Sequence, residues 1–136
     1  MPVTLVDSTV LLDILTEDPA WIGWSTEALA TAAEAGPLAI NPIIYAEVSV
    51  RFSRVEDLDD ALPPLDFRRL ALPWDAGFLA GKAFSSYRRN GGTRSSTMPD
   101  FYIGAHAAVA GLTLLTRDVA RYRTYFPLLD LVTPSS

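Results

Sequence analysis

The chain has 136 residues, of which 49% are hydrophobic, and it carries a formal net charge of −5 at pH 7 with no cysteine. This length fits one domain with a real core, which excludes a disordered tail or adaptor. The lack of cysteine excludes disulfides, thiolate metal sites and cysteine nucleophiles.

Short apolar runs alternate with helical segments along the whole chain. Asn41-Pro42 is a strong helix start, with asparagine as the N-cap and proline at the first helical position, and Gly111 ends a later helix. The first half of the chain is predicted to form a strand over residues 3–6, helices over 9–15 and 18–35, a strand over 38–40, and helices over 42–53 and 56–60. The second half is predicted to form a strand over 67–72, a helix over 74–89 and a loop over 90–97. A helix over 99–110 and strands over 112–115 and 128–132 complete the chain.

This alternation predicts an α/β fold in which a short central parallel sheet is flanked by helices on both faces, a three-layer α/β/α arrangement. The sequence has no internal repeat, linker or low-complexity tract, so residues 1–136 are expected to form a single domain. The N-terminus lacks the basic start and apolar stretch of a signal peptide, and no window approaches the ~20 apolar residues that cross a bilayer. We therefore expect an intracellular, cytoplasmic protein with no membrane partner.

The negative net charge hides an uneven distribution. Residues 1–76 hold 13 acidic and 4 basic side chains, whereas residues 77–136 hold 3 acidic and 7 basic ones. A basic second half is compatible with a phosphate backbone as partner even in an acidic protein. Ordinary solvated helix faces would explain the same charges.

Two aspartates follow predicted strands. Asp7 comes directly after the first strand, and Asp118 follows residues 112–115 after a short turn. Ligands of such sheets bind at the carboxyl ends of the strands, where both residues would lie. Either aspartate alone would more commonly be a helix cap.

Two further acids lie on helix faces that the pattern expects to be buried. Glu47 shares the face of Ile43, Ile44 and Val48, and Asp100 has the same spacing to apolar residues of the helix over 99–110. An unpaired inward carboxylate is costly, so it pairs, takes up a proton or binds a cation. Pairing of Glu47 with Arg51, and simple stabilisation of a helix N-terminus by Asp100, remain alternatives.

A single metal site would explain all four acids together. Clustered carboxylates repel one another unless a cation or protons neutralise them. All-oxygen ligation, without cysteine and with one histidine, selects a hard ion such as Mg²⁺ or Mn²⁺. Such ions suit phosphodiester chemistry, because they polarise a phosphoryl oxygen and lower the pKa of bound water.

The same four acids lie in segments that resemble the motifs of PIN domains. The likeness consists of an apolar strand, an aspartate and a hydroxyl residue two places later, then a mid-helix glutamate, an aspartate opening an alanine-rich helix, and a final aspartate after a strand. The four segments are residues 5–12 around Asp7, residues 41–48 around Glu47, residues 99–107 around Asp100, and residues 114–118 ending at Asp118, followed by Tyr122 and residues 125–127. They occur in the expected order and span essentially the whole chain.

The resemblance implies an endoribonuclease that depends on Mg²⁺ or Mn²⁺, with Asp7, Glu47, Asp100 and Asp118 holding one or two ions and water attacking the RNA backbone in line. Thr9 and Thr116 match hydroxyl positions that support these acids. Family members of this length resemble VapC toxins, which are typically homodimeric, cleave tRNA or rRNA and are silenced by a VapB-type antitoxin. We therefore expect an RNA substrate, a cognate antitoxin and a homodimer.

Four arginines and one further aspartate lie near these motifs. Arg88, Arg89 and Arg94, around the predicted loop, are candidate RNA contacts, and Arg117 either contacts phosphate or neutralises the acids. Asp13 is an additional acid six positions after Asp7, on a short helix that could face either way, and it is not expected in the site.

The aromatic and histidine residues outside these motifs have other expectations. His106 is expected to be a hydrogen-bonded helix histidine rather than a catalyst. Trp21, Trp24 and Trp74 are expected in the core or an interface, and the helix bearing Trp21 and Trp24 could line an antitoxin groove.

Two other functions are compatible with parts of this pattern. Haloacid-dehalogenase phosphatases also place an aspartate after the first strand, but they need a second aspartate where this chain has Thr9, and Lys82 is the only lysine. A non-catalytic PIN-like module that binds RNA or a protein is the stronger alternative. Degenerate members usually lose acids, and this chain keeps all four.

Overall fold

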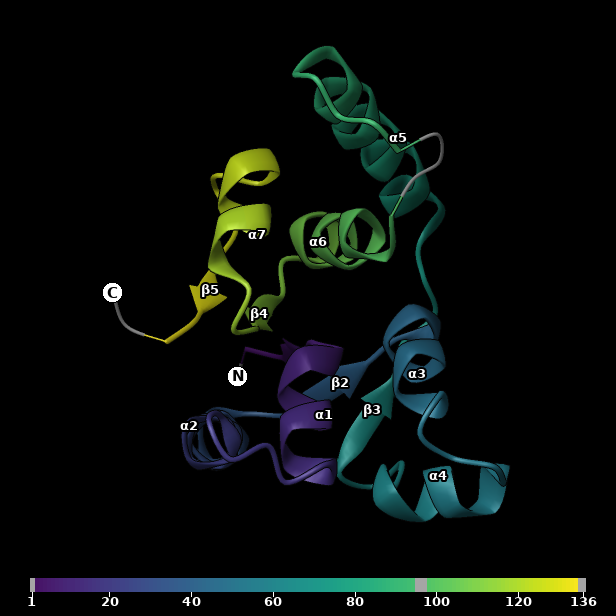
Figure 1. Ribbon diagram of the computed structural model, residues 1–136, viewed down its shortest axis with the longest axis vertical. Coiled ribbons are helices and arrows are strands. Elements are labelled where there is room, and N and C mark those ends of the chain that lie inside the picture. The colour runs from purple at the N-terminus through teal and green to yellow at the C-terminus, as the bar shows by residue number, and fades with distance from the viewer. Residues whose placement is uncertain (1, 95–97, 135–136) are drawn as a thin grey trace.

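Five parallel strands form the centre of the fold, in the spatial order β3-β2-β1-β4-β5 (Figure 1). The structure is a computed structural model that describes residues 2–94 and 98–134. The strands are β1 (Thr4–Val6), β2 (Leu38–Ile40), β3 (Phe67–Arg69), β4 (Thr113–Leu115) and β5 (Leu131–Val132). Leu5, Val6, Leu114 and Leu115 are fully buried, so the central strands form the middle of the core.

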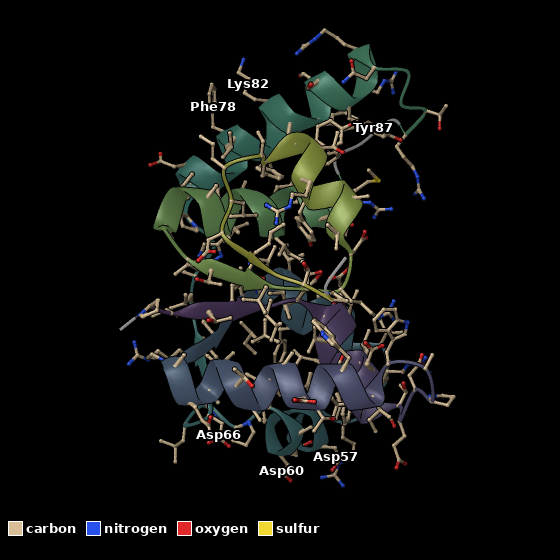
Figure 2. All side chains as sticks on the ribbon, turned by 90° about the vertical axis from the view of Figure 1, so that its left-hand side faces the viewer. Asp57, Asp60, Asp66, Phe78, Lys82 and Tyr87 are labelled. Carbon is tan, nitrogen blue, oxygen red and sulfur yellow. The ribbon has the colours of Figure 1, made fainter. Side chains whose placement is uncertain are left out.

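Helices cover both faces of this sheet. They are α1 (Ser8–Leu15), α2 (Ile22–Ala35), α3 (Pro42–Ser49), α4 (Val55–Ala61), α5 (Trp74–Arg89), α6 (Pro99–Ala110) and α7 (Val119–Tyr125). Figure 2 shows α5, α6 and α7 on one side of the sheet and α2 and α4 on the other. Helix α3 contacts both α1 and α6 and so connects the two sides. The predicted three-layer α/β/α fold is confirmed.

The strand order defines where a ligand should bind. From β1 the chain moves outward through β2 to β3, and it then crosses to the other side of β1 to form β4 and β5. The connections therefore reverse direction between β1 and β4. In open parallel sheets, the crevice at the carboxyl ends of such a strand pair is the usual ligand site.

Most predicted elements are present, with differences at their ends. The second helix begins at Ile22 rather than at Asp18, because the Asp18 carboxylate accepts hydrogen bonds from the backbone N–H groups of Ala20 and Trp21 and holds a turn there. The third helix ends at Ser49, and β3 ends at Arg69. Residues 95–97 of the predicted loop lie outside the described residues.

One helix was not predicted at all. Helix α7 follows β4 after a turn of residues 116–118, although its sequence contains two tyrosines and a threonine, which have modest helix propensity. Tertiary packing compensates, because Tyr122 is fully buried and Phe126, at the C-cap, is 6% exposed. No helix among the described residues is long and apolar enough to cross a membrane.

Candidate metal centre

The pairing of β1 with β4 brings two predicted site residues side by side. Val6 pairs with Leu115, and the backbone N–H of Asp7 continues the ladder by donating to the carbonyl of Leu115 at 2.9 Å. The residues that follow these two strands, Asp7 and Thr116, therefore lie side by side. Thr116 Oγ1 donates to Asp7 Oδ2 at 2.7 Å. Both side chains lie at the expected crevice.

Asp7 is almost completely enclosed, with 1% of its surface exposed. Its Oδ2 also lies 3.3 Å from the Tyr122 hydroxyl and 3.4 Å from Thr9 Oγ1. Its Oδ1 is buried without a hydrogen-bond partner among the described residues. Burial raises the pKa of the Asp7 carboxyl to about 6, and repulsion from Asp100 and Glu47 adds to the rise while the Thr116 hydrogen bond opposes it.

Glu47 reaches the same place from α3. It is half-buried, and its Oε1 accepts a hydrogen bond from Ser8 Oγ at 2.8 Å. Burial raises the pKa of the Glu47 carboxyl and repulsion from Asp100 raises it further, against the Ser8 hydrogen bond. The alternative partner Arg51 is exposed, and none of the ion pairs between described residues joins it to Glu47.

The start of α3 is held by a buried polar pair. Asn41 Oδ1 accepts from the backbone N–H of Ile44 at 2.9 Å, as predicted for an N-cap. The Asn41 amide nitrogen is therefore free to donate to His106 Nδ1, 3.0 Å away. His106 is 1% exposed, and burial lowers its pKa, so the neutral ring accepts this bond. His106 thus fixes the helix that carries Glu47, which agrees with its predicted structural role.

Asp100 lies in the first turn of α6, where its side chain is 17% exposed. Its Oδ2 forms an ion pair with Arg121, and its Oδ1 lies 3.4 Å from the Tyr122 hydroxyl. Burial raises the pKa of Tyr122 well above its usual value, and the charges of Asp7 and Asp100 raise it further. The protonated hydroxyl can therefore donate to either carboxylate.

Asp118 lies at the edge of this group. Its side chain is 39% exposed, and the nearest cationic atom is Arg121 Nε at 4.0 Å. Its backbone N–H donates to Thr116 Oγ1 at 3.1 Å, which ties the turn after β4 to the residue that contacts Asp7. The structure thus brings Asp7, Glu47 and Asp100 together and connects Asp118 to them through Arg121.

Helix capping does not explain the two aspartates that follow strands. Asp7 is the N-cap residue of α1 and Asp118 is the N-cap residue of α7. Neither side chain makes the hydrogen bond to the helix N-terminus that a capping aspartate normally makes. The Asp7 carboxylate instead accepts a hydrogen bond from the Thr116 hydroxyl, and the Asp118 carboxylate lies 4.0 Å from Arg121 Nε.

The carboxylates are close enough to repel one another but are not arranged as a finished cage. Among residues 2–94 and 98–134, no three acidic or histidine side chains are close enough together to ligate one cation. Arg121 pairs with Asp100 and approaches Asp118, so one cationic side chain already neutralises part of the group. The donor set nevertheless fits a hard cation, since it is all oxygen and includes the unpartnered Asp7 Oδ1.

The four predicted RNA-contacting arginines lie in different surroundings. Arg117 makes a two-point ion pair with the buried Asp13 and lies over the Trp21 ring, 5.1 Å from its centroid. Arg88 donates to the Arg94 carbonyl at 2.5 Å, and Arg89 and Arg94 are exposed.

The three tryptophans also differ. Trp21 and Trp24 pack edge to face with ring centroids 6.3 Å apart, and both are partly buried. Trp74 is 94% exposed at the start of α5, so its expected place in the core is wrong and only the interface interpretation remains.

Three contacting residues were given no role in the site from the sequence, although Tyr122 was noted beside the fourth motif. Ser8 supports Glu47, Tyr122 lies between Asp7 and Asp100, and Arg121 pairs with Asp100. Arg121 and Tyr122 lie one turn after Asp118, and a predicted helix over these residues would have indicated that both reach the site. The contact of Ser8 with Glu47 joins residues 39 apart in the chain and had no local signal.

Comparison of the sequence with models of protein families identifies the family of this chain. Residues 4–127 match the PIN domain family, and the chain belongs to that family. No curated protein sequence matches the chain.

Solved structures with the same fold come from toxin–antitoxin complexes. VapBC2 from Rickettsia felis, bound to a DNA fragment from its promoter, aligns with a TM-score of 0.74 at 17% identity over 98% of this chain and 99% of that chain. VapBC-1 from nontypeable Haemophilus influenzae gives a TM-score of 0.71 at 16% identity over 96% and 97%. A toxin–antitoxin complex from Klebsiella pneumoniae gives 0.68 at 22% identity over 98% of each chain.

Proposed function

We propose that this PIN domain is an endoribonuclease that depends on Mg²⁺ or Mn²⁺. The observation that carries the proposal is Asp7, a buried carboxylate at the strand crevice with one oxygen unpartnered and two further acids near enough to raise its pKa. A divalent cation would remove this electrostatic cost. No other described feature of the crevice supplies a partner for that oxygen.

The residues divide into ligands and supports. Asp7 would be the first ligand of the ion, and Glu47, Asp100 and Asp118 would complete its shell by moving toward it, because no three described acids are close enough to share a cation as they stand. The bound ion polarises a phosphoryl oxygen and makes water a better nucleophile. The hydroxyls of Thr116 and Tyr122 bind the Oδ2 side of Asp7 and leave Oδ1 available.

Two other hydroxyls complete the support. Ser8 orients Glu47 at 2.8 Å, and Thr9 lies 3.4 Å from Asp7. Such hydrogen bonds fix the direction of ligand oxygens before the ion arrives.

We further propose that the chain is the toxin of a VapBC-type pair, cleaves tRNA or rRNA in the cytoplasm and is silenced by a VapB-type antitoxin. Support comes from the family match and from the toxin–antitoxin complexes that share the fold over nearly the whole chain. A groove of about 500 Å³ beside α2, lined by Trp24, Ala28 and Val132 among others, is a candidate surface for the antitoxin.

The nuclease proposal is tested with purified, partner-free protein and total tRNA and rRNA. Cleavage into discrete fragments is expected with Mg²⁺ or Mn²⁺ and is expected to stop in EDTA. Asp7→Asn should lose it as well. Asp66→Asn is the matched control, because Asp66 is exposed and precedes β3 at the opposite edge of the sheet, so this variant should cleave like the wild type (Figure 2).

Two results would contradict the proposal. Cleavage that persists in EDTA would remove the metal requirement. Absence of cleavage of any RNA by folded protein with bound Mn²⁺ would favour a PIN-like module that binds RNA or protein without cutting it.

A further inference from the structure

A second groove lies next to the acidic residues, between α5 and α7. It has a volume of about 430 Å³ and is lined by Tyr87, Arg94, Met98, Arg121 and Tyr125, together with small residues of α7. Figure 2 shows Tyr87 on the side of α5 that faces α7, opposite to Phe78 and Lys82. The groove therefore combines two guanidinium groups with two aromatic rings.

The aromatic rings are held in fixed positions by packing. Tyr87 and Tyr125 have ring centroids 6.3 Å apart at 68°, and each packs edge-on against the fully buried Phe101, at 5.7 and 5.2 Å. Both tyrosines remain partly exposed. Rigid, half-exposed aromatic rings are the surfaces on which unpaired nucleobases stack.

Arg94 is held at the groove by the chain that follows α5. Gly92 donates its backbone N–H to the Tyr87 carbonyl at 2.9 Å, and the backbone N–H of Arg94 lies 3.4 Å from the Tyr87 hydroxyl. A Cβ on Gly92 would lie 2.3 Å from the Tyr87 ring, so only glycine permits this approach. The Arg94 side chain is exposed.

Arg121 joins the groove to the acidic residues. Its Nη1 contacts Asp100, its Nε is 4.0 Å from Asp118, and its side chain is 47% exposed. A guanidinium has five N–H donors, so the contact with Asp100 leaves donors for an anion. A phosphate bound to Arg121 would lie beside the carboxylates.

We propose that this groove binds one nucleotide of a single-stranded RNA substrate, with its phosphate on Arg94 and Arg121 and its base on Tyr87 or Tyr125. The inference rests on the proposed function and places a nucleotide subsite on the groove beside the carboxylates. A base in a duplex is stacked on its neighbours and cannot reach the rings, so unpaired RNA is selected. The groove adds positive charge beside a site whose carboxylates repel phosphate.

The test measures binding apart from cleavage. Fluorescence anisotropy follows a labelled single-stranded RNA of about 12 nucleotides in the presence of Ca²⁺, with a gel to show that the RNA stays intact. Arg94→Gln and Arg121→Gln should each weaken binding about tenfold, as loss of a charge-assisted hydrogen bond predicts. Each should also reduce the salt dependence of binding by about 0.7 in the logarithmic slope.

The matched control is Arg123→Gln, which removes the same charge from an exposed position of α7 outside the groove and should change binding by less than about twofold. A strand of equal length with abasic sites, and a duplex of the same sequence, should both bind more weakly to the wild type. Any of three results would contradict the proposal that the groove binds a nucleotide. They are equal losses of RNA affinity in all three arginine variants, equal affinity for strands with and without bases, and no binding of RNA. Selective loss of binding in a protein that never cleaves RNA would support the groove and contradict the nuclease proposal.

Discussion

At Asp7 the fold buries a carboxylate whose two oxygens have different surroundings. Oδ2 lies near the hydroxyls of Thr116, Tyr122 and Thr9, whereas Oδ1 has no partner among the described residues. A buried charge without full pairing destabilises the folded state, and the raised pKa of about 6 expresses that cost. We therefore expect the free energy of unfolding of the metal-free protein to be lower at neutral pH than it would be with Asp7 uncharged.

We predict that Asp7→Asn stabilises the metal-free protein at pH 8. The folded-state pKa of about 6 lies above the ordinary value of 3.8, so the stability that this group contributes is present below about pH 4 and is lost as the pH rises to 6. A shift of this size corresponds to about 3 kcal/mol at most. Urea unfolding in EDTA between pH 4.5 and 8 should show a stability excess of the variant that shrinks as the pH falls.

The control for this measurement is Asp66→Asn, whose side chain is exposed and which should show no pH-dependent excess. Saturating Mg²⁺ should stabilise the wild type and not Asp7→Asn, since binding to the folded state adds to its stability. A wild type that is at least as stable as Asp7→Asn in EDTA at pH 8 would contradict this reading of the burial.

The sequence identified the acidic residues and the supporting hydroxyls Thr9 and Thr116, but not the other side chains around them. Asp7 and Asp118 were found because they follow strands, and Glu47 and Asp100 because they lie on apolar helix faces. Contacts such as that of Tyr122 with Asp7 join residues 115 apart. Their partners depend on helix packing, which local patterns do not specify.

Between elements, a buried ion pair connects α1 to the turn after β4. Asp13, whose side chain is 3% exposed, accepts two hydrogen bonds from Arg117 at 2.8 Å and a third from Ser25 of α2, also at 2.8 Å. The turn that contains Arg117 also carries Thr116 and Asp118. This pair therefore holds the turn that completes the site.

We predict that Arg117→Ala destabilises the protein by about 3 kcal/mol, because it leaves the Asp13 charge buried with only Ser25 as a partner. The double variant Asp13→Asn, Arg117→Ala should be more stable than Arg117→Ala alone, since it removes the unpaired charge. Chemical denaturation of the three proteins measures both effects. A double variant that is less stable than Arg117→Ala would show that charge burial is not the cause.

Elements with strong end signals were predicted most accurately. Asn41-Pro42 marks the start of α3, and Gly111, with a φ of +66°, ends α6 in the left-handed conformation that glycine favours. Helix α7 was missed although Asp118, a residue type that favours N-caps, precedes it, because residues 119–125 themselves have modest helix propensity. It forms because burial of Tyr122 outweighs its modest propensity.

At the scale of the whole molecule, the outer face of α5 is a candidate surface for the contact between two copies of the chain. Trp74 and Phe78 are 94% and 71% exposed, one helical turn apart, and Lys82 follows one turn later with its ammonium 5.0 Å from the Phe78 ring. Figure 2 shows Phe78 and Lys82 pointing away from the domain. Neighbouring exposed aromatic residues are typical of protein interfaces, which fits the predicted homodimer.

We predict that Trp74→Ser, Phe78→Ser lowers the fraction of dimer at a given protein concentration without unfolding the chain, because both side chains are largely outside the core. Analytical ultracentrifugation of the wild type and the variant measures this. Leu65→Ser, at a residue that is 100% exposed on another part of the surface, is the control and should leave association unchanged. Association that is identical in all three proteins would place the interface elsewhere.

The layer order of the molecule was predictable, whereas its exposed faces were not. Alternating short strands and helices can form few arrangements other than a covered parallel sheet, which the structure has. The sequence pattern did not decide whether Trp74 would lie in the core or at an interface, since a tryptophan in an amphipathic helix is usually buried. Which aromatic side chains of α5 are exposed can be determined only when the packing of α5 on α6 is known.

The most direct test of the metal site is crystallography of the protein soaked in Mn²⁺, with anomalous scattering used to locate the ion. A peak about 2.2 Å from Asp7 Oδ1, with Glu47 or Asp100 as a further ligand, is the predicted result. It should be absent in Asp7→Asn crystals treated in the same way. An ordered crevice in which Asp7 Oδ1 stays without a cation at saturating Mn²⁺ would contradict the account.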